Sequence, residues 1–429
     1  MAEVRPFRAL RYDPAVADPS RTIAPPYDVI SPALQTELYD RDAHNIIRIE
    51  YGREQSGDSE AANRYTRAAA ELRDWRSKGV LALDPEPAIY VYRQRFEWNS
   101  TRYERTAYFG AVRLEEWEAG VVKPHEHTLS HPKADRMNLI RATQAQVSPV
   151  YSVFRPRKSD GLWFEHPEHA EIAIDGGGER HLIDRVTDEI AIADFARLIE
   201  ESDVYIADGH HRYETALAYR DEVRGRSAPW TGDEPENFVL MALTRHSDPG
   251  LLVLPTHRLV HLPSLPDDAL SRIAARFDTH RVDTADADTL ILSLEEAKQE
   301  TAAFVVAGLP EGAYLLTLRD RGAIEAMMPG DQPHAWKRLD VNVLQYGILQ
   351  DVFGIDDARL KAGASVSYTQ DEREALRSVA AGEAQLAFLL NATPVEQVLA
   401  VADAGGRMPQ KSTYFHPKLP TGLVVSSLT

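Results

Sequence analysis

The sequence contains no cysteine. This absence excludes disulfide bonds, thiolate nucleophiles, and zinc or iron–sulfur sites that need cysteine ligands. Any covalent catalysis therefore has to use a hydroxyl, lysine, histidine or carboxylate group. Any metal ion has to be held by histidine and oxygen ligands.

Long apolar runs and positive charge are also scarce. No stretch reaches the ~18 consecutive apolar residues of a membrane-spanning helix. The start, MAEVRPFRALRYD, carries charges where a signal peptide has an apolar segment. We therefore expect a cytoplasmic protein without a membrane partner. Because 48 Lys and Arg stand against 66 Asp and Glu, the net charge is −18, which makes nucleic acid an unexpected partner.

The patterning that is present predicts a mixed α/β fold of the α+β class. Stretches with helical apolar spacing are interspersed with short β-branched and aromatic stretches. The sequence predicts a hairpin that turns at Asn99 and Ser100, and a helix from Lys133 to Gln146. With 429 residues the chain exceeds one ordinary core. The pattern restarts near residue 263, so we expect an N-terminal domain over residues 1–264 and a C-terminal α+β domain over residues 265–429.

The stretch VYIADGHHRYETALAYRDE, which begins at residue 204, predicts a strand, a turn at Gly209 and a helix. The first N–H groups of a helix point outward and attract anions. His210, His211 and Arg212 add side-chain donors there, and an arginine fork suits phosphate. Asp208 precedes them directly. We interpret the stretch as a phosphate-binding turn; a charged helix start without a ligand is the alternative.

The ten residues DGHHRYETAL resemble the phosphate-binding box of the ParB/sulfiredoxin superfamily, which includes free-serine kinases. The resemblance implies a nucleotide-binding core of that type with additional α/β elements. It also implies that Gly209, His211 and Arg212 contact nucleotide phosphates. His210 stands where sulfiredoxin has its catalytic cysteine, a departure that excludes sulfinic-acid reduction by that route.

A longer series of motifs covers the chain almost end to end and resembles the family called domain of unknown function 1015. The motifs follow one another in the order RPFRALRYDP, APPYDVIS, HNIIRIEYG, PHEHT, ADGHHRYETAL, LPTHRLV and MPQKSTYFHPKLPTGLV.

Two further motifs carry candidate catalytic or metal-binding groups. In APPYDVIS the two prolines stiffen the chain before Asp28, whose carboxylate is a candidate general base or magnesium ligand. KPHEHTLSHPKADR holds a second candidate base, Glu126, and the metal-ligand candidates His125 and His127, with His131 nearby. Arg136 of the same motif is an alternative anion contact. A capped turn and a polar loop are the respective alternatives.

Arg258 in LPTHRLV and Lys411 in GGRMPQKSTYF are candidate anion contacts. The second motif is not a P-loop, because that motif needs glycine before Lys-Ser/Thr and a following helix. Lys411, Ser412 and Lys418 can still close over an anion from a loop, and an ordered tail without a ligand is the alternative.

Together the motifs predict a nucleotide-dependent phosphotransferase acting on a small hydroxyl compound, with free L-serine suggested by the superfamily resemblance. The expected cofactors are Mg²⁺ and ATP or ADP. A non-catalytic nucleotide-binding regulator and a His-ligated metal-dependent hydrolase are the alternatives. The candidate catalytic residues are Asp28, Glu126 and Asp208, and the candidate phosphate-binding residues are Gly209, His210, His211, Arg212, Arg258 and Lys411.

Overall fold

The computed structural model describes residues 1–128, 130–158, 172–176, 178–226, 229–283, 286–297, 301–409 and 411–429, without the side chains of residues 130, 131 and 176. Contacts within the chain divide it into two compact units. Unit 1 comprises Met1–Pro124, Thr128–Leu252 and Pro417–Thr429, and unit 2 comprises His125–His127 and Val253–His416. The chain therefore returns to unit 1 at its C-terminal end. The division at residue 264 stays a prediction, while the predicted mixed α/β class is confirmed.

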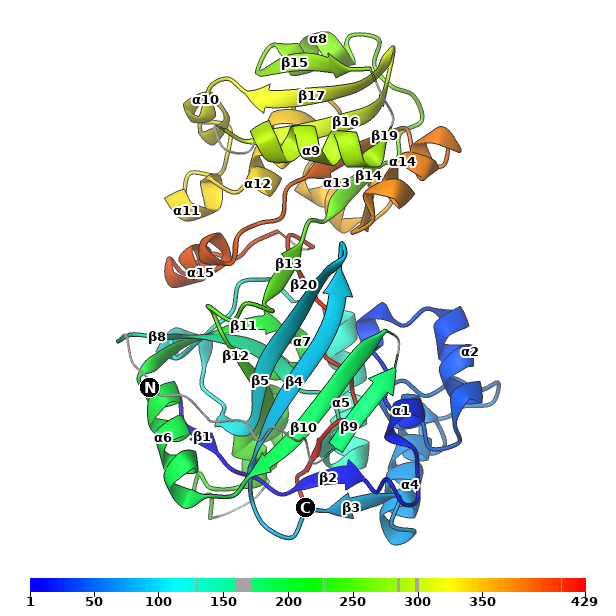
Figure 1. Cartoon of the computed structure of the whole chain (residues 1–429), viewed down its shortest axis with the longest axis vertical. Coiled ribbons are helices and arrows are strands. Elements are labelled where there is room, and N and C mark those ends of the chain that lie inside the picture. The colour runs from blue at the N-terminus through cyan, green and yellow to red at the C-terminus, as the bar shows by residue number, and fades with distance from the viewer. Residues whose placement is uncertain are drawn as a thin grey trace. The chain divides into compact units, whose positions relative to one another are not determined.

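Unit 1 is built on a nine-stranded sheet (Figure 1). Its strands are β1 (Val4–Arg5), β4 (Ile89–Trp98), β5 (Thr101–Arg113), β6 (Val122–Lys123), β8 (Val150–Pro156), β9 (Ile172–Gly176), β10 (Glu179–Val186), β11 (Ser202–Asp208) and β12 (Phe238–Arg245). The order is β6-β11-β8-β12-β5-β4-β10-β9, and β1 also pairs with β5. The predicted hairpin is confirmed: β4 and β5 turn at Asn99 and Ser100, whose φ angles of 46° and 60° are typical of a type I′ turn.

A second, four-stranded sheet of unit 1 includes the C-terminal strand of the chain. Its strands, in order, are β3 (Leu81–Leu83), β2 (Ala9–Tyr12), β21 (Val425–Ser427) and β7 (Ala145–Gln146). The predicted helix over residues 133–146 is wrong at its end. Helix α5 (Ser130–Thr143) stops before Gln144, which has a φ of 50°, and the next two residues pair with β21 instead.

The helices of unit 1 are α1 (Pro19–Thr22), α2 (Pro32–Arg41), α3 (Ile47–Glu50), α4 (Arg64–Ser77), α5, α6 (Glu189–Glu200) and α7 (His210–Arg224). Helix α7 is fixed by its buried side, where Tyr213 and Leu217 join the core of the main sheet. The Tyr213 ring stacks on Trp117 at 4.6 Å between centroids, and its hydroxyl donates to the Glu115 carbonyl at 2.9 Å. Full burial of one such side chain stabilises by about 1.5 to 3 kcal/mol, so the start of α7 is held firmly against the sheet.

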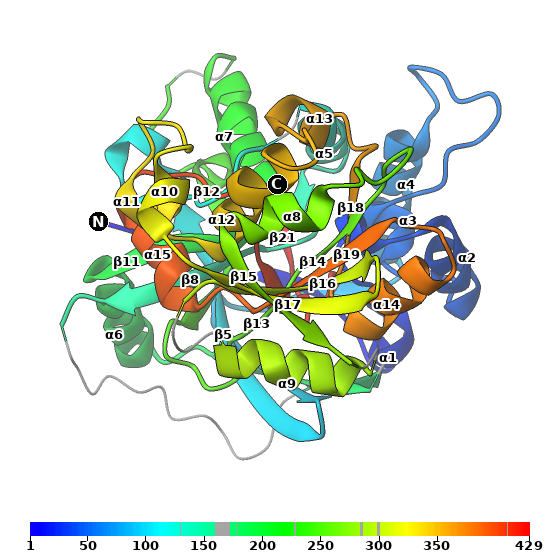
Figure 2. The ribbon, with the colours of Figure 1, turned by 90° about the horizontal axis from the view of Figure 1, so that it is seen from above.

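Unit 2 is a sheet covered by helices on both faces (Figure 2). Its six strands, in order, are β15 (Phe277–Val282), β17 (Gly312–Leu318), β16 (Ala303–Leu309), β19 (Leu386–Leu390), β14 (His257–Val260) and β18 (Val366–Thr369). A further short pair joins β13 (Leu252–Leu254) and β20 (Tyr414–His416). The helices are α8 (Ala269–Ala274), α9 (Ala287–Ala297), α10 (Arg321–Glu325), α11 (His334–Lys337), α12 (Asp340–Leu344), α13 (Asp357–Lys361), α14 (Glu372–Ala380) and α15 (Val395–Asp403). Helices α9 and α14 pack on one face, and α8, α10, α11, α12 and α15 pack on the other.

Over the described residues, no helix combines the length and the apolar character needed to cross a membrane.

Candidate functional site

The turn between β11 and α7 has the geometry that an anion-binding helix start requires. Gly209 has a φ of 92°, which L side chains rarely adopt, and it directly precedes the helix. A Cβ at this position would lie 2.8 Å from Nε of Arg212, so glycine also makes room for that guanidinium. The predicted strand–turn–helix is therefore present, with the dipole of a 15-residue helix behind it.

Asp208 stands between two cations at this turn. One carboxylate oxygen accepts from Arg212, and the other accepts from Nζ of Lys418 at 2.5 Å. Arg212 also donates to the carbonyl of Pro149. Burial alone would raise the pKa of Asp208, but the charges of Lys418 and Arg212 lower it far below its usual range. Asp208 is therefore ionised at neutral pH and fixes both cations beside the helix start.

The two adjacent histidines have different surroundings. His210 is only 5% exposed, so its ring lies in the interior. His211 is half-buried, and burial lowers its pKa, so its ring is neutral at pH 7. Glu214 accepts from the Thr128 hydroxyl at 2.6 Å and from Nζ of Lys133 at 2.9 Å, which ties the first turn of α7 to α5.

The PPYD segment reaches the start of α7. Tyr27 and Asp28 belong to a 3-10 turn, Tyr27–Val29, in which Asp28 is exposed. Burial raises the pKa of Tyr27 to about 12, and the charge of Arg212 acts against that rise. The charge of Asp28 in turn acts on His211, opposing the fall in its pKa. These electrostatic effects extend over short distances only, so Asp28 and His211 share one local site.

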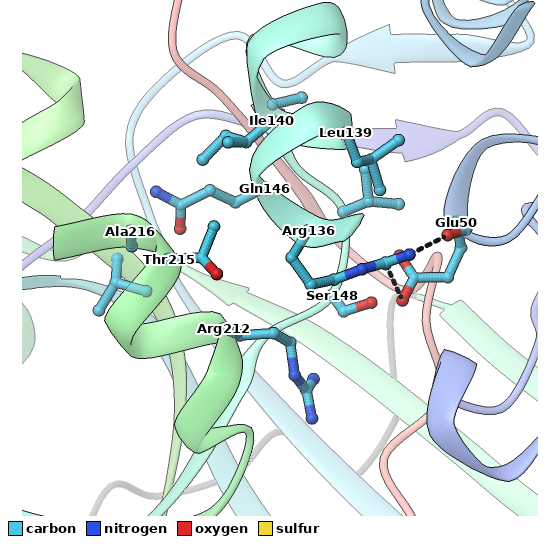
Figure 3. Close-up of a pocket in the computed structure, with 12 residues that line it drawn as sticks. Glu50, Arg136, Leu139, Ile140, Gln146, Ser148, Arg212, Thr215 and Ala216 are labelled. Atoms are coloured by element: carbon cyan, nitrogen blue, oxygen red, sulfur yellow. Dashed lines mark hydrogen bonds and ion pairs between the residues drawn. The ribbon is translucent and has the colours of Figure 1, made fainter. Parts of the chain in front are cut away.

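A small cavity with both polar and apolar lining residues lies behind this turn (Figure 3). It has a volume of about 50 Å³ and is lined by Arg212 and Thr215 of α7 and by Arg136 of α5, whose side chain extends toward Glu50 in Figure 3. Nε of Arg212 and Oγ1 of Thr215 are buried there without a hydrogen-bond partner among the described residues. The space suits a few waters or one small polar group and is far too small for a nucleotide.

Arg136 lines this cavity from α5 and is held by several charged neighbours. It pairs with Glu50 at 3.1 Å and Asp135 at 2.6 Å, and its guanidinium lies 4.1 Å from the centre of the Tyr27 ring. Burial would lower the pKa of Arg136, but the Glu50 and Asp135 charges raise it above its ordinary value. Asp135 also pairs with Arg64 of α4 at 2.6 Å, so two carboxylates face two arginines, and together they link α3, α4, α5 and the PPYD turn.

The remaining candidates belong to unit 2. Arg258 is buried with its guanidinium over the Tyr368 ring, while Lys411 is exposed in a loop. Glu126 forms a β-bridge with Met408. The phosphate-binding and catalytic roles of these three residues stay predictions.

The metal-ligand candidates also lie in unit 2. His125 is buried, with Nε2 3.2 Å from the Thr413 hydroxyl and its ring beside Phe415, whereas His127 is exposed. Within the part of the chain that the structure describes, no group of three or more His, Asp or Glu side chains could hold a metal ion. His131 follows them in the same motif, and its side chain lies outside the part of the chain that the structure describes.

Two residues near the turn, Thr215 and Glu50, were not among the predicted site residues, whereas Lys418 and Arg136 were predicted only as alternative anion contacts. Nothing local in the sequence indicates that Lys418 lies beside Asp208, 210 residues earlier. A tertiary contact of this kind leaves no periodic signal in one sequence.

Comparison with solved structures finds relatives of low identity. A conserved hypothetical protein from Pyrococcus furiosus is 15% identical with a TM-score of 0.34, covering 71% of this chain and 92% of that one. A mutant free serine kinase in complex with ADP is 13% identical with a TM-score of 0.35, covering 71% and 89%. A C-terminally truncated SbnI from Staphylococcus aureus is 10% identical with a TM-score of 0.35, covering 74% and 87%. No curated protein matches the chain.

The family comparison gives a clear result. Residues 4–342 match the family described as "protein of unknown function (DUF1015)". The match covers most of the chain and includes the PPYD, HEHT, GHHR and LPTHRLV motifs. The chain therefore belongs to the DUF1015 family, as its series of motifs predicted.

Proposed function

We propose that the chain binds a nucleotide by its phosphates at the start of α7 and transfers the terminal phosphoryl group to a small hydroxyl compound. One observation carries this proposal: the Gly209 turn opens a helix N-terminus at which Asp208 holds Arg212 and Lys418. Backbone donors and two cations at one point are what a phosphate group needs. Because the cavity behind the turn is small, the nucleotide lies on the outer side of the turn.

Asp208 fits a positioning role better than that of a general base. A base has to accept a proton near neutral pH, and the lowered pKa of Asp208 makes its carboxylate a very weak base. Its carboxylate instead fixes Arg212 and Lys418 so that little reorganisation is needed when a phosphate arrives. An arriving phosphate competes with Asp208 for the same two cations.

Asp28 is the stronger candidate for the base. Its carboxylate is exposed, close enough to His211 to affect the pKa of that ring, and on the side of the turn that faces solvent. In the transfer, the acceptor oxygen bonds to phosphorus, the bond to the leaving phosphate breaks, and the acceptor proton passes to Asp28. A Mg²⁺ ion would supply charge neutralisation, and a carboxylate such as that of Asp28 is a ligand of the type Mg²⁺ prefers.

The test is direct. The protein is incubated with Mg²⁺, ATP or ADP, and L-serine, and phosphoserine is measured; L-serine comes first because the DGHHRYETAL box resembles that of free-serine kinases. We expect Asp28→Asn to lower kcat by at least about 100-fold, as loss of a general base does. Asp40→Asn, which changes an exposed carboxylate on α2, serves as the matched control and leaves kcat unchanged.

Absence of turnover with either nucleotide across a panel of hydroxy compounds would overturn the transferase proposal. Nucleotide binding without turnover would support the regulatory alternative instead. Asp28→Asn with unchanged kcat would move the base role to another carboxylate.

A further inference from the structure

Unit 2 contains a buried arginine whose charge is not balanced by a described acid. Arg258, on β14, is 5% exposed, and it forms no ion pair with any carboxylate in the described part of the chain. Its contacts are the carbonyl of Thr256, to which it donates, and the Tyr368 ring, whose centre lies 5.6 Å away. Four buried arginines of unit 1, by contrast, pair with carboxylates: Arg11 with Asp84, Arg93 with Asp184, Arg136 with Glu50 and Arg220 with Glu116.

The charge of Arg258 cannot be removed by deprotonation at physiological pH. Burial lowers the pKa of Arg258 to about 10, which leaves the guanidinium charged at pH 7. A buried charge without a counter-charge is strongly unfavourable. One carbonyl and a ring at 5.6 Å offset only part of that cost, because this distance is near the limit of a cation–π contact.

A second polar group beside Arg258 also lacks a partner. Oγ1 of Thr256 is buried, with the residue 3% exposed, and makes no hydrogen bond within the described residues. Thr256 and Arg258 are two positions apart at the start of β14, so we expect their side chains on the same side of the strand. A hydroxyl donor next to a guanidinium fork matches the donor set that binds an oxyanion.

The residue between them contributes no charge. His257 is fully buried, and its Nδ1 accepts from the backbone N–H of Leu390 at 3.2 Å. Burial and the nearby Arg258 charge lower the pKa of His257 to about 4, so the ring is neutral at pH 7. Arg258 is therefore the only charge that this tripeptide presents.

We propose that unit 2 binds an oxyanion, the phosphate or carboxylate group of a small metabolite, at Arg258 and the Thr256 hydroxyl. The oxyanion accepts from the guanidinium and from Oγ1 of Thr256, and it supplies the missing counter-charge. This site belongs to unit 2 alone and does not depend on the reaction proposed for unit 1.

The first test measures the unliganded protein. In chloride buffer we expect Arg258→Met to keep or raise Tm, because it replaces an unbalanced buried charge by an apolar side chain of similar length. Arg93→Met is the matched control: it removes the 3.0 Å ion pair of Arg93 with the buried carboxylate of Asp184, so its Tm falls. A fall in Tm for Arg258→Met as large as that for Arg93→Met would contradict an unbalanced charge.

The second test measures the anion in full-length Arg212→Met/Lys418→Met protein, which lacks both cations proposed to bind phosphate in unit 1. Inorganic phosphate and acetate are titrated separately at constant ionic strength, and Tm is followed. We expect at least one of them to raise Tm, and the responding anion identifies a phosphate or a carboxylate ligand. The added Arg258→Met change removes the response, and Thr256→Val weakens the apparent Kd about 5- to 10-fold, the value of one lost hydrogen bond.

If Arg258→Met does not fold, Arg258→Lys replaces it, and we expect about tenfold weaker binding because the lysine cannot form a forked pair. Tm that is insensitive to both anions, or a response that survives loss of Arg258, would overturn the proposal. Either result leaves the assay of phosphoserine formation unaffected, so the two proposals fail separately.

Discussion

Asp208→Asn gives the sharpest test of the anion-binding turn. The substitution keeps the shape of the side chain and removes the charge that holds Arg212 and Lys418. The three side chains retain between 11% and 17% exposure, so we take the lower end of the cost of breaking a buried ion pair, about 3 kcal/mol. In a unit of this size we expect Tm to fall by about 6 to 12 °C at pH 7.

The pH dependence of this effect has a definite sign. The folded-state pKa of Asp208 lies far below the unfolded value of about 3.9, so the stabilisation is present above that value. It is lost as the pH falls through the folded-state pKa. The difference in Tm between wild type and variant is therefore largest near neutrality and shrinks below about pH 4.

The assay is calorimetry with and without inorganic phosphate. Because Asp208 competes with phosphate for the two cations, we expect phosphate to raise Tm more in Asp208→Asn than in wild type. Asp74→Asn, which breaks the exposed pair with Lys78, is the control and costs less than about 1 kcal/mol. A Tm for Asp208→Asn as high as that of the control would refute the stabilising ion pairs of Asp208. A smaller Tm increase with phosphate than in wild type would refute the competition between Asp208 and phosphate.

Three further substitutions test the site and unit 2. We expect Gly209→Ala to lower the free energy of unfolding in urea by about 1 to 3 kcal/mol and to abolish phosphate binding by displacing Arg212. The control Gly225→Ala, at an αR position with φ of −66°, should have little effect on unfolding. Lys418→Met should weaken phosphate binding and reduce its dependence on salt by about one counterion, measured by titration at several salt concentrations; an unchanged salt slope would exclude a direct contact. His257 has a folded-state pKa of about 4, below the unfolded value of about 6.5. The free energy of unfolding should therefore fall by up to about 3 kcal/mol as the pH drops from about 6.5 to 4. Unfolding of the His257→Gln variant should lack this part of the pH dependence.

Local signals in the sequence were enough to predict the parts of the fold that depend on neighbouring residues. Asn99 and Ser100 adopt the left-handed backbone angles that the hairpin turn requires. At position 209 the φ of 92° is unstrained for glycine but not for residues with a side chain. The helical spacing after Gly209 predicted α7 because one side of that helix packs on the sheet.

The rest of the site depends on contacts between distant parts of the chain. Gln144 has good helical neighbours, yet the pairing of the next two residues with β21 ends α5 before it. Lys418 completes the turn from the C-terminal segment, and Arg136 pairs with Glu50 across 86 positions. No spacing rule in a single sequence relates such positions, so the motifs predicted the strand–turn–helix at Gly209 but not the pairing of Asp208 with Lys418.

The placement of β21 between β2 and β7 has a consequence for the order of events during synthesis. The ribosome delivers β2 and β7 early, but the strand that joins them comes from the last residues of the chain. Throughout translation of unit 2, the two edges of β2 and β7 that later pair with β21 stay open, and open edges are prone to wrong pairing. Unit 2 can complete its own sheet before β21 emerges, so unit 1 is the later unit to close. A nascent chain paused before Pro417 should therefore be protease-sensitive in unit 1, because Lys418 and β21 have not yet been made.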